Sequence, residues 1–196
     1  LGDVYKRQIL AGLISCFLAV PCLSLANDEK IPEGAGGGAI ALQTDGKSDL
    51  LQAVRAKDYD KALQIVNGQI EAHPGDADAY DRRSAVYALL GRYDQALADC
   101  DKAISLEPGA AFHYFNRGAI YEQRKEYQLA VNDYTKALSL SQNGDHLQGL
   151  MYFNRARAYT AIEAYDKALA DLKQGEKLAP AFPHNYFLES LVYDCL

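Results

Sequence analysis

A five-residue pattern recurs along the chain at a nearly constant period, and this period constrains the fold more than any other feature. The pattern is a tyrosine, two variable residues, an alanine, and then leucine or valine. Its tyrosines are separated by 34, 34 and 38 residues. A period of this length is typical of proteins in which each repeat is one supersecondary unit. The pattern begins at Tyr59, Tyr93, Tyr127 and Tyr165.

Each repeat is predicted to be a pair of helices. Segments 79–90 and 93–106 carry apolar residues at steps of three and four, the pattern of an amphipathic helix. Gly91 stands between them, where it can end the first helix, and Pro108 follows the second. One helix hairpin cannot bury its own apolar face, so we expect the hairpins to stack and to share a core.

Because the five-residue pattern, the helical segments and the residues that end them follow one register, the chain resembles the tetratricopeptide repeat family. The resemblance implies an all-α fold, a right-handed superhelical solenoid of antiparallel helix hairpins, with four repeats and the start of a fifth. It covers residues 43 to 196, nearly all of the chain that follows residue 26. In the family's frame the repeats are 43–76, 77–110, 111–144 and 149–182, with a partial repeat at 183–196.

The residues before the repeats are expected to lie outside the fold. Residues 1–26 are interpreted as an adapter-like scar followed by a signal peptide, because Lys6 and Arg7 precede an apolar run that ends in small side chains. Residues 27–42 are glycine-rich and predict a flexible linker. We therefore expect an exported protein, periplasmic or secreted. A retained membrane anchor, or a lipoprotein attached through Cys16, is the alternative. The sequence stops within a helix at Leu196, which suggests a fragment.

Three arginine–aspartate pairs share a separation of 16 residues. In the family's frame each pair joins the two helices of one hairpin, so we interpret the pairs as structural ion pairs. The alternative is that they are charged ligand-binding residues. The pairs are Arg83 with Asp99, Arg117 with Asp133, and Arg155 with Asp171.

The resemblance also implies a binding groove. In this family the first helices of successive hairpins line a concave groove that receives an extended peptide or a partner helix. Asparagine amides at equivalent positions of neighbouring repeats could donate to and accept from a peptide backbone. The alternative is that these residues are solvated or contact the fifth repeat. Transferred position by position, the groove residues are Arg82, Phe112, Phe115, Asn116, Phe153, Asn154, Arg157 and Phe187.

Some ligand classes are not expected. The net charge is −6, which disfavours nucleic acid as a partner. Family members that grip a carboxylate tail need a lysine and an asparagine before the central asparagine, and a lysine and an arginine after it. Around Asn116 this chain has Asp81 and Ala85 in place of the first pair, and Leu150 and Asn154 in place of the second. Without these cations a terminal carboxylate gains little.

No catalytic chemistry is expected from the sequence. The four histidines are scattered without the spacing of a helical zinc site, and no nucleophile or phosphate-binding motif appears. We therefore expect no metal, no cofactor and no enzymatic activity. The predicted function is a protein–protein interaction scaffold for a peptide or protein partner, with membrane contact only through a retained or lipidated leader. The alternative is the repeat region of a larger enzyme or envelope assembly factor with a catalytic domain beyond Leu196.

Overall fold

The computed structural model describes residues 44–141, 146–179 and 192. Within these residues the secondary structure is helical, with eight helices and no strand. The expected leader and linker, Phe187 and nearly all of the partial fifth repeat lie outside the described residues. The helices are α2 (Thr44–Arg55), α3 (Tyr59–Ala72), α4 (Ala77–Leu89), α5 (Tyr93–Leu106), α6 (Ala111–Gln123), α7 (Tyr127–Leu140), α8 (His146–Ala161) and α9 (Tyr165–Leu178).

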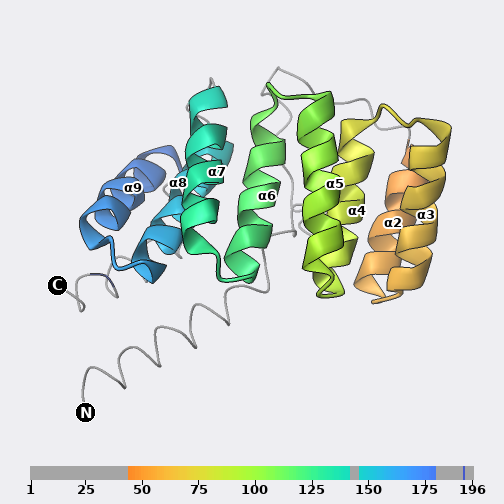
Figure 1. Ribbon diagram of the computed structural model, residues 1–196, viewed down its shortest axis with the longest axis horizontal. Coiled ribbons are helices and arrows are strands. Elements are labelled where there is room, and N and C mark those ends of the chain that lie inside the picture. Colours follow the sequence, from red (N-terminus) through yellow and green to blue (C-terminus); the bar gives the residue numbers. More distant parts are fainter. Residues whose placement is uncertain (1–43, 142–145, 180–191, 193–196) are drawn as a thin grey trace, which may run out of the picture. The chain divides into compact units, whose positions relative to one another are not determined.

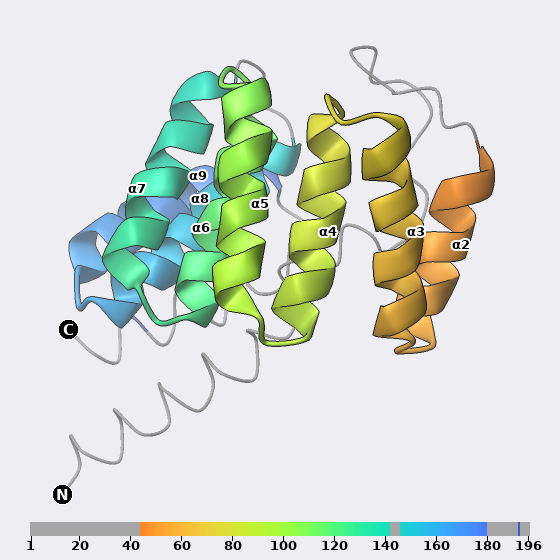
Figure 2. The ribbon, with the colours of Figure 1, turned by 45° about the vertical axis from the view of Figure 1, so that its right-hand side comes forward.

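The described helices belong to two compact units, α2 to α5 in one and α6 to α9 in the other. In the first, each helix packs against the next one along the chain (Figures 1 and 2). In the second, consecutive helices also pack together, and α6 additionally contacts α8. These are the stacked hairpins that the period predicted, so the all-α repeat solenoid is confirmed. The handedness of its superhelix stays a prediction.

The core of each unit is built around the alanines of the recurring pattern. Ala62, Ala96, Ala130 and Ala168 are fully buried. In the first unit Ala62 packs with aliphatic residues such as Leu50. In the second unit, α6, α7 and α8 share a cluster of aromatic and aliphatic side chains. Small side chains let two helix backbones approach closely, and this is why alanine recurs in the pattern. The cluster shared by α6, α7 and α8 comprises Phe115, Ala130, Val131, Tyr134, Ala137, Met151 and Ala158.

Helix α6 approaches α7 closely at Gly118. A β-carbon at this position would lie 2.8 Å from Cε1 and 2.9 Å from Cδ1 of Tyr134, and 3.3 Å from Cβ of Asp133. The Tyr134 side chain is fully buried and cannot move into solvent. The spacing between these two helices therefore depends on the absence of a side chain at residue 118.

We predict that Gly118→Ala lowers the free energy of unfolding by about 1–3 kcal/mol, the usual effect of overpacking a core. The matched control is Gly68→Ala in α3, because a β-carbon there meets no atom within 4 Å. The control should be stabilised by about 1 kcal/mol, since alanine favours a helix interior. Urea unfolding followed by circular dichroism measures both variants, and a stabilised Gly118→Ala would contradict the close approach.

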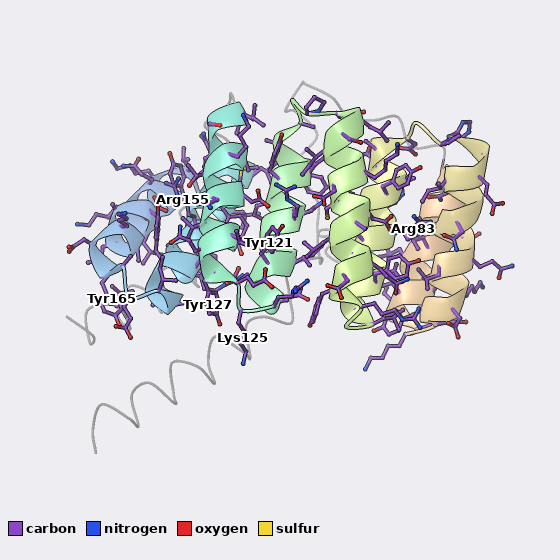
Figure 3. The ribbon with its side chains drawn as sticks, viewed as in Figure 1. Arg83, Tyr121, Lys125, Tyr127, Arg155 and Tyr165 are labelled. Atoms are coloured by element: carbon purple, nitrogen blue, oxygen red, sulfur yellow. The ribbon has the colours of Figure 1, made fainter. Side chains whose placement is uncertain are left out.

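The turn inside each hairpin contains one residue in the left-handed backbone region. In the α4–α5 hairpin it is Gly91, with φ of 70°. In the other three hairpins it is Lys57, Lys125 and Glu163, with φ of 58°, 64° and 61°. Figure 3 shows Lys125 at the end of the α6–α7 hairpin. Glycine reaches this conformation without steric cost, whereas a β-carbon there crowds the backbone. The turn geometry is thus repeated in all four hairpins, but only one of them has the residue that suits it.

We predict that Gly91→Ala destabilises the chain by roughly 1 kcal/mol, since a residue with a β-carbon must then adopt a left-handed conformation. The added β-carbon meets nothing within 4 Å, so a clash cannot cause the loss. Gly75→Ala is the control, because its β-carbon also meets nothing and its backbone is not left-handed. An equal loss in both variants, measured by urea unfolding, would show that the turn conformation is not the cause.

Among the described residues, no helix combines the length and the apolar character that crossing a bilayer requires.

Candidate functional site

The structure forms all three arginine–aspartate pairs that share the 16-residue separation. In each, the arginine on the first helix of a hairpin donates two hydrogen bonds to the aspartate on the second helix, from Nε and Nη2. The nitrogen–oxygen distances are 2.7–2.8 Å. The aspartate side chains are 8–9% exposed and the arginine side chains 16–23%. Such two-pronged, charge-assisted pairs are geometrically specific, so each one fixes how the two helices of its hairpin meet.

Two tyrosines flank each of these arginines, one three residues before it and one four residues after it. The Arg83 guanidinium carbon lies 5.7 and 5.8 Å from the ring centroids of Tyr80 and Tyr87. Equivalent distances are 5.8 and 6.0 Å around Arg117, and 5.6 and 5.7 Å around Arg155. Figure 3 shows Arg83 and Arg155 in their hairpins. The sequence analysis did not assign these tyrosines this contact. Their spacing around the arginine is the signal that could have revealed it.

Two of the arginines also reach the preceding hairpin. Arg83 Nη1 donates to Oδ1 of Asn67 on α3 at 2.9 Å. Arg155 Nη1 donates to Oγ1 of Thr135 on α7 at 3.1 Å. The hydrogen bond to Asp99 raises the pKa of Arg83. Burial lowers the pKa of Arg155, but the hydrogen bond and charge of Asp171 outweigh it and the pKa is raised. Both guanidinium groups are therefore held in the charged form.

We predict that Arg117→Met lowers the free energy of unfolding by about 3 kcal/mol, because it leaves the Asp133 carboxylate largely buried without its partner. Methionine keeps an unbranched apolar stem, so the change in the free energy of unfolding comes mainly from the lost charge and its hydrogen bonds. The control is Arg124→Met, whose pair with Glu126 is one-third exposed and should be worth less than about 1 kcal/mol. Arg117→Lys should recover only part of the loss, since lysine lacks the forked geometry. In urea unfolding, a loss as small as that of the control would refute the structural role.

The predicted groove residue Arg82 lies in the first unit. Its Nη2 is 3.0 Å from Oδ2 of Asp76, and its Nε donates to Oε1 of Gln69 at 3.1 Å. Arg82 thus links α4 to α3 and to the turn before α4, and its charge is already matched by a carboxylate. This paired state was not expected from the sequence.

The remaining described groove residues lie on α6 and α8. Asn116, Asn154 and Phe112 are half-buried. The amide nitrogen of Asn154 donates to the carbonyl oxygen of Leu150 at 2.8 Å, within α8. Phe112 packs against the cluster of α6, α7 and α8.

Three of the expected groove residues are buried instead of lining an open surface. Phe115 and Phe153 are each 8% exposed. Phe115 packs in the shared cluster, with its ring centroid 5.6 Å from that of Tyr134, and Phe153 packs with Leu172. Arg157 is 7% exposed and binds a buried glutamate. The physical reason is that these side chains fill the space between neighbouring helices, so at least part of the transferred groove serves as core.

The partner of Arg157 is Glu122, which the sequence analysis did not single out. Arg157 Nη2 donates to Oε2 of Glu122 at 2.7 Å, and Arg157 Nε donates to the other carboxylate oxygen. The Tyr134 hydroxyl donates to Oε2 of Glu122 at 2.8 Å. Burial and the negative charge of Glu122 raise the pKa of the neighbouring Tyr127 phenol. The network joins α6, α7 and α8, and no recurring spacing in the sequence marks it.

Comparisons with known proteins agree with this architecture. Models of the tetratricopeptide repeat match in tandem at residues 77–110, 111–143 and 150–182, just over half of the chain. A search of the curated proteins found no match.

Several solved structures share the fold. MamA from Desulfovibrio magneticus RS-1 aligns with a TM-score of 0.61 at 18% identity, covering 76% of this chain and 88% of that one. YrrB, described as having an unusual peptide-binding site, aligns at 0.57 and 23% identity, covering 65% and 63%. The first repeat domain of Spaghetti (RPAP3), bound to the HSP90 peptide SRMEEVD, aligns at 0.57 and 20% identity, covering 61% and 91%.

Proposed function

Because the chain belongs to the tetratricopeptide repeat family, we propose that it is a non-catalytic interaction scaffold. It holds an extended peptide segment of a partner protein along the first helices of its hairpins. The observation that supports the site is the pair of half-buried asparagines, Asn116 and Asn154, which occupy equivalent places on α6 and α8. These two helices contact each other within one unit.

The chemistry of asparagine suits a peptide backbone. Its amide carries two donors and a carbonyl acceptor. In Asn154 one donor bonds the Leu150 carbonyl, and the second donor with the carbonyl oxygen is enough to pair with both groups of a peptide unit, whatever the ligand's side chains are. Phe112, on the same helix as Asn116, is half-buried and adds a rigid apolar contact. Two of the similar structures, YrrB and the Spaghetti (RPAP3) domain, are described with a peptide-binding site or a bound peptide.

The charges of the described arginines indicate how the ligand is held. Arg82, Arg117, Arg155 and Arg157 are each paired with a carboxylate. A carboxylate on the ligand would have to compete with these partners. We therefore propose that backbone hydrogen bonds and apolar contacts hold the segment, and that a terminal carboxylate contributes little.

The alternative, that these repeats belong to a larger enzyme or assembly factor, leaves the scaffold role in place. The matched models describe helix hairpins, and this argues for interaction and against catalysis in residues 77–182. Sequencing the full reading frame tests the alternative directly. A catalytic domain after the repeats would make the scaffold a substrate-holding or assembly module of that enzyme.

We predict that Asn116→Ala combined with Asn154→Ala weakens partner binding about fivefold or more, since a net hydrogen bond is worth about 1 kcal/mol and the variant removes at least one. The full chain is immobilised, and the proteins it captures from an extract of its source cells are quantified by mass spectrometry. A competitor titration gives the change in affinity.

The matched control removes two amides from a second helix, Gln128→Ala with Asn132→Ala. Both residues are exposed on α7, and Gln128 Nε2 donates to Asn132 Oδ1 at 3.3 Å. The control should bind as the unmodified chain does. Undiminished capture by the Asn116/Asn154 variant, with its unfolding curve unchanged, would reject the proposed site.

A further inference from the structure

The network of Glu122, Tyr134 and Arg157 brings together three helices of the second unit. Glu122 is in the last turn of α6, Tyr134 is in the middle of α7, and Arg157 is on α8 of the next hairpin. The Glu122 side chain is 1% exposed and the Arg157 side chain 9%. The carboxylate of Glu122 accepts both donors of the Arg157 fork and the hydroxyl of Tyr134.

Net stability is a poor explanation for this network. Removing two charges from water costs several kcal/mol per ion, and apolar residues of similar volume often stabilise a protein as well or better. The surroundings are already apolar, since the Phe153 ring centroid lies 5.9 Å from the Arg157 guanidinium carbon and Phe115 packs against Tyr134. An apolar substitute for the network would therefore have suitable neighbours.

Geometry explains the network better. A forked guanidinium meets a carboxylate in one orientation, and the Tyr134 hydroxyl fixes the carboxylate from a third helix. The apolar contacts among α6, α7 and α8 are less directional and permit several offsets of α8. Burial lowers the pKa of Arg157, but the charge and hydrogen bonds of Glu122 outweigh it and the pKa is raised, so the fork stays charged.

We propose that Glu122, Tyr134 and Arg157 form a register lock, which holds α8 at a single offset against α6 and α7. The arginine–aspartate pairs join helices within a hairpin, whereas this lock joins two hairpins. Because the lock fixes α8 against α6, it also fixes the distance between Asn116 and Asn154 that a bound peptide would meet. The lock itself does not require that any peptide binds.

The test compares the offset of two hairpins with and without the lock. Spin labels are attached to cysteines introduced at Gln128 and Lys177, in the full chain with its four native cysteines changed to alanine. Both positions are exposed, near opposite ends of α7 and α9, so their separation is sensitive to sliding along the helix axes. Pulsed electron–electron double resonance gives the distribution of distances between the two labels.

With Glu122, Tyr134 and Arg157 unchanged, the two spin labels should give one narrow peak. In the variant Glu122→Leu, Tyr134→Phe, Arg157→Met we expect a broad distribution or a second peak, displaced by up to about one helical turn of roughly 5 Å. The urea midpoint of this variant should be unchanged or higher, which separates loss of register from loss of stability. The control, Arg124→Gln with Glu126→Gln, removes a pair that is one-third exposed and should keep the narrow peak.

A single narrow peak at the original distance in the apolar variant would overturn the proposal. If that variant does not fold, Arg157→Lys is measured instead, because lysine keeps the charge and loses the fork. Broadening in Arg157→Lys supports the lock, and an unchanged peak overturns it. The asparagine variants above leave this measurement unaffected, so failure of the lock and failure of the peptide site are distinguished.

Discussion

An arginine forked onto an aspartate and flanked by two tyrosines recurs in three of the described hairpins, and it sets how the two helices of each one meet. The fork fixes the first helix of a hairpin against the second, and in these three hairpins the alanine of the recurring pattern is buried between the helices so aligned. The tyrosine rings partly shield the guanidinium from water, so the ion pair is worth more than an exposed one. Where Arg83 and Arg155 extend to Asn67 and Thr135, the same group also connects one hairpin to the one before it.

Much of this arrangement could be predicted from the sequence because it repeats. The 34-residue period places the hairpins, and the constant separation of arginine and aspartate predicts their contact. Gly91 marks one hairpin turn, but Lys57, Lys125 and Glu163 adopt the same backbone without any residue signal, since the local turn geometry overrides their preference. Local and recurring features were therefore the predictable ones.

The candidate site was harder to predict, because its key contacts occur once. Glu122 and Arg157 are 35 residues apart and lie in different hairpins, so neither helical spacing nor the repeat period points to them. Phe115 and Phe153 stand at positions that the family frame assigns to a groove, but their large rings are drawn into the spaces between helices. The position of a residue in the repeat frame predicts the direction of its side chain. The volume of the side chain and its partners decide whether the side chain is exposed or buried.

The contacts from Arg83 to Asn67 and from Arg155 to Thr135 have a consequence for how such an array can change length. Both acceptors stand at the same position of their repeats, and Asp101, a further possible acceptor, occupies that position in the repeat between them. If recombination deletes or duplicates one whole hairpin, the arginine of the following hairpin would therefore again find a hydrogen-bond acceptor in the hairpin before it. The junction between Glu122 and Arg157 has no such interchangeable partner. Gain or loss of hairpins would be tolerated where the contacts repeat. Helices α6, α7 and α8, which the single Glu122–Arg157 contact joins, would be gained or lost together.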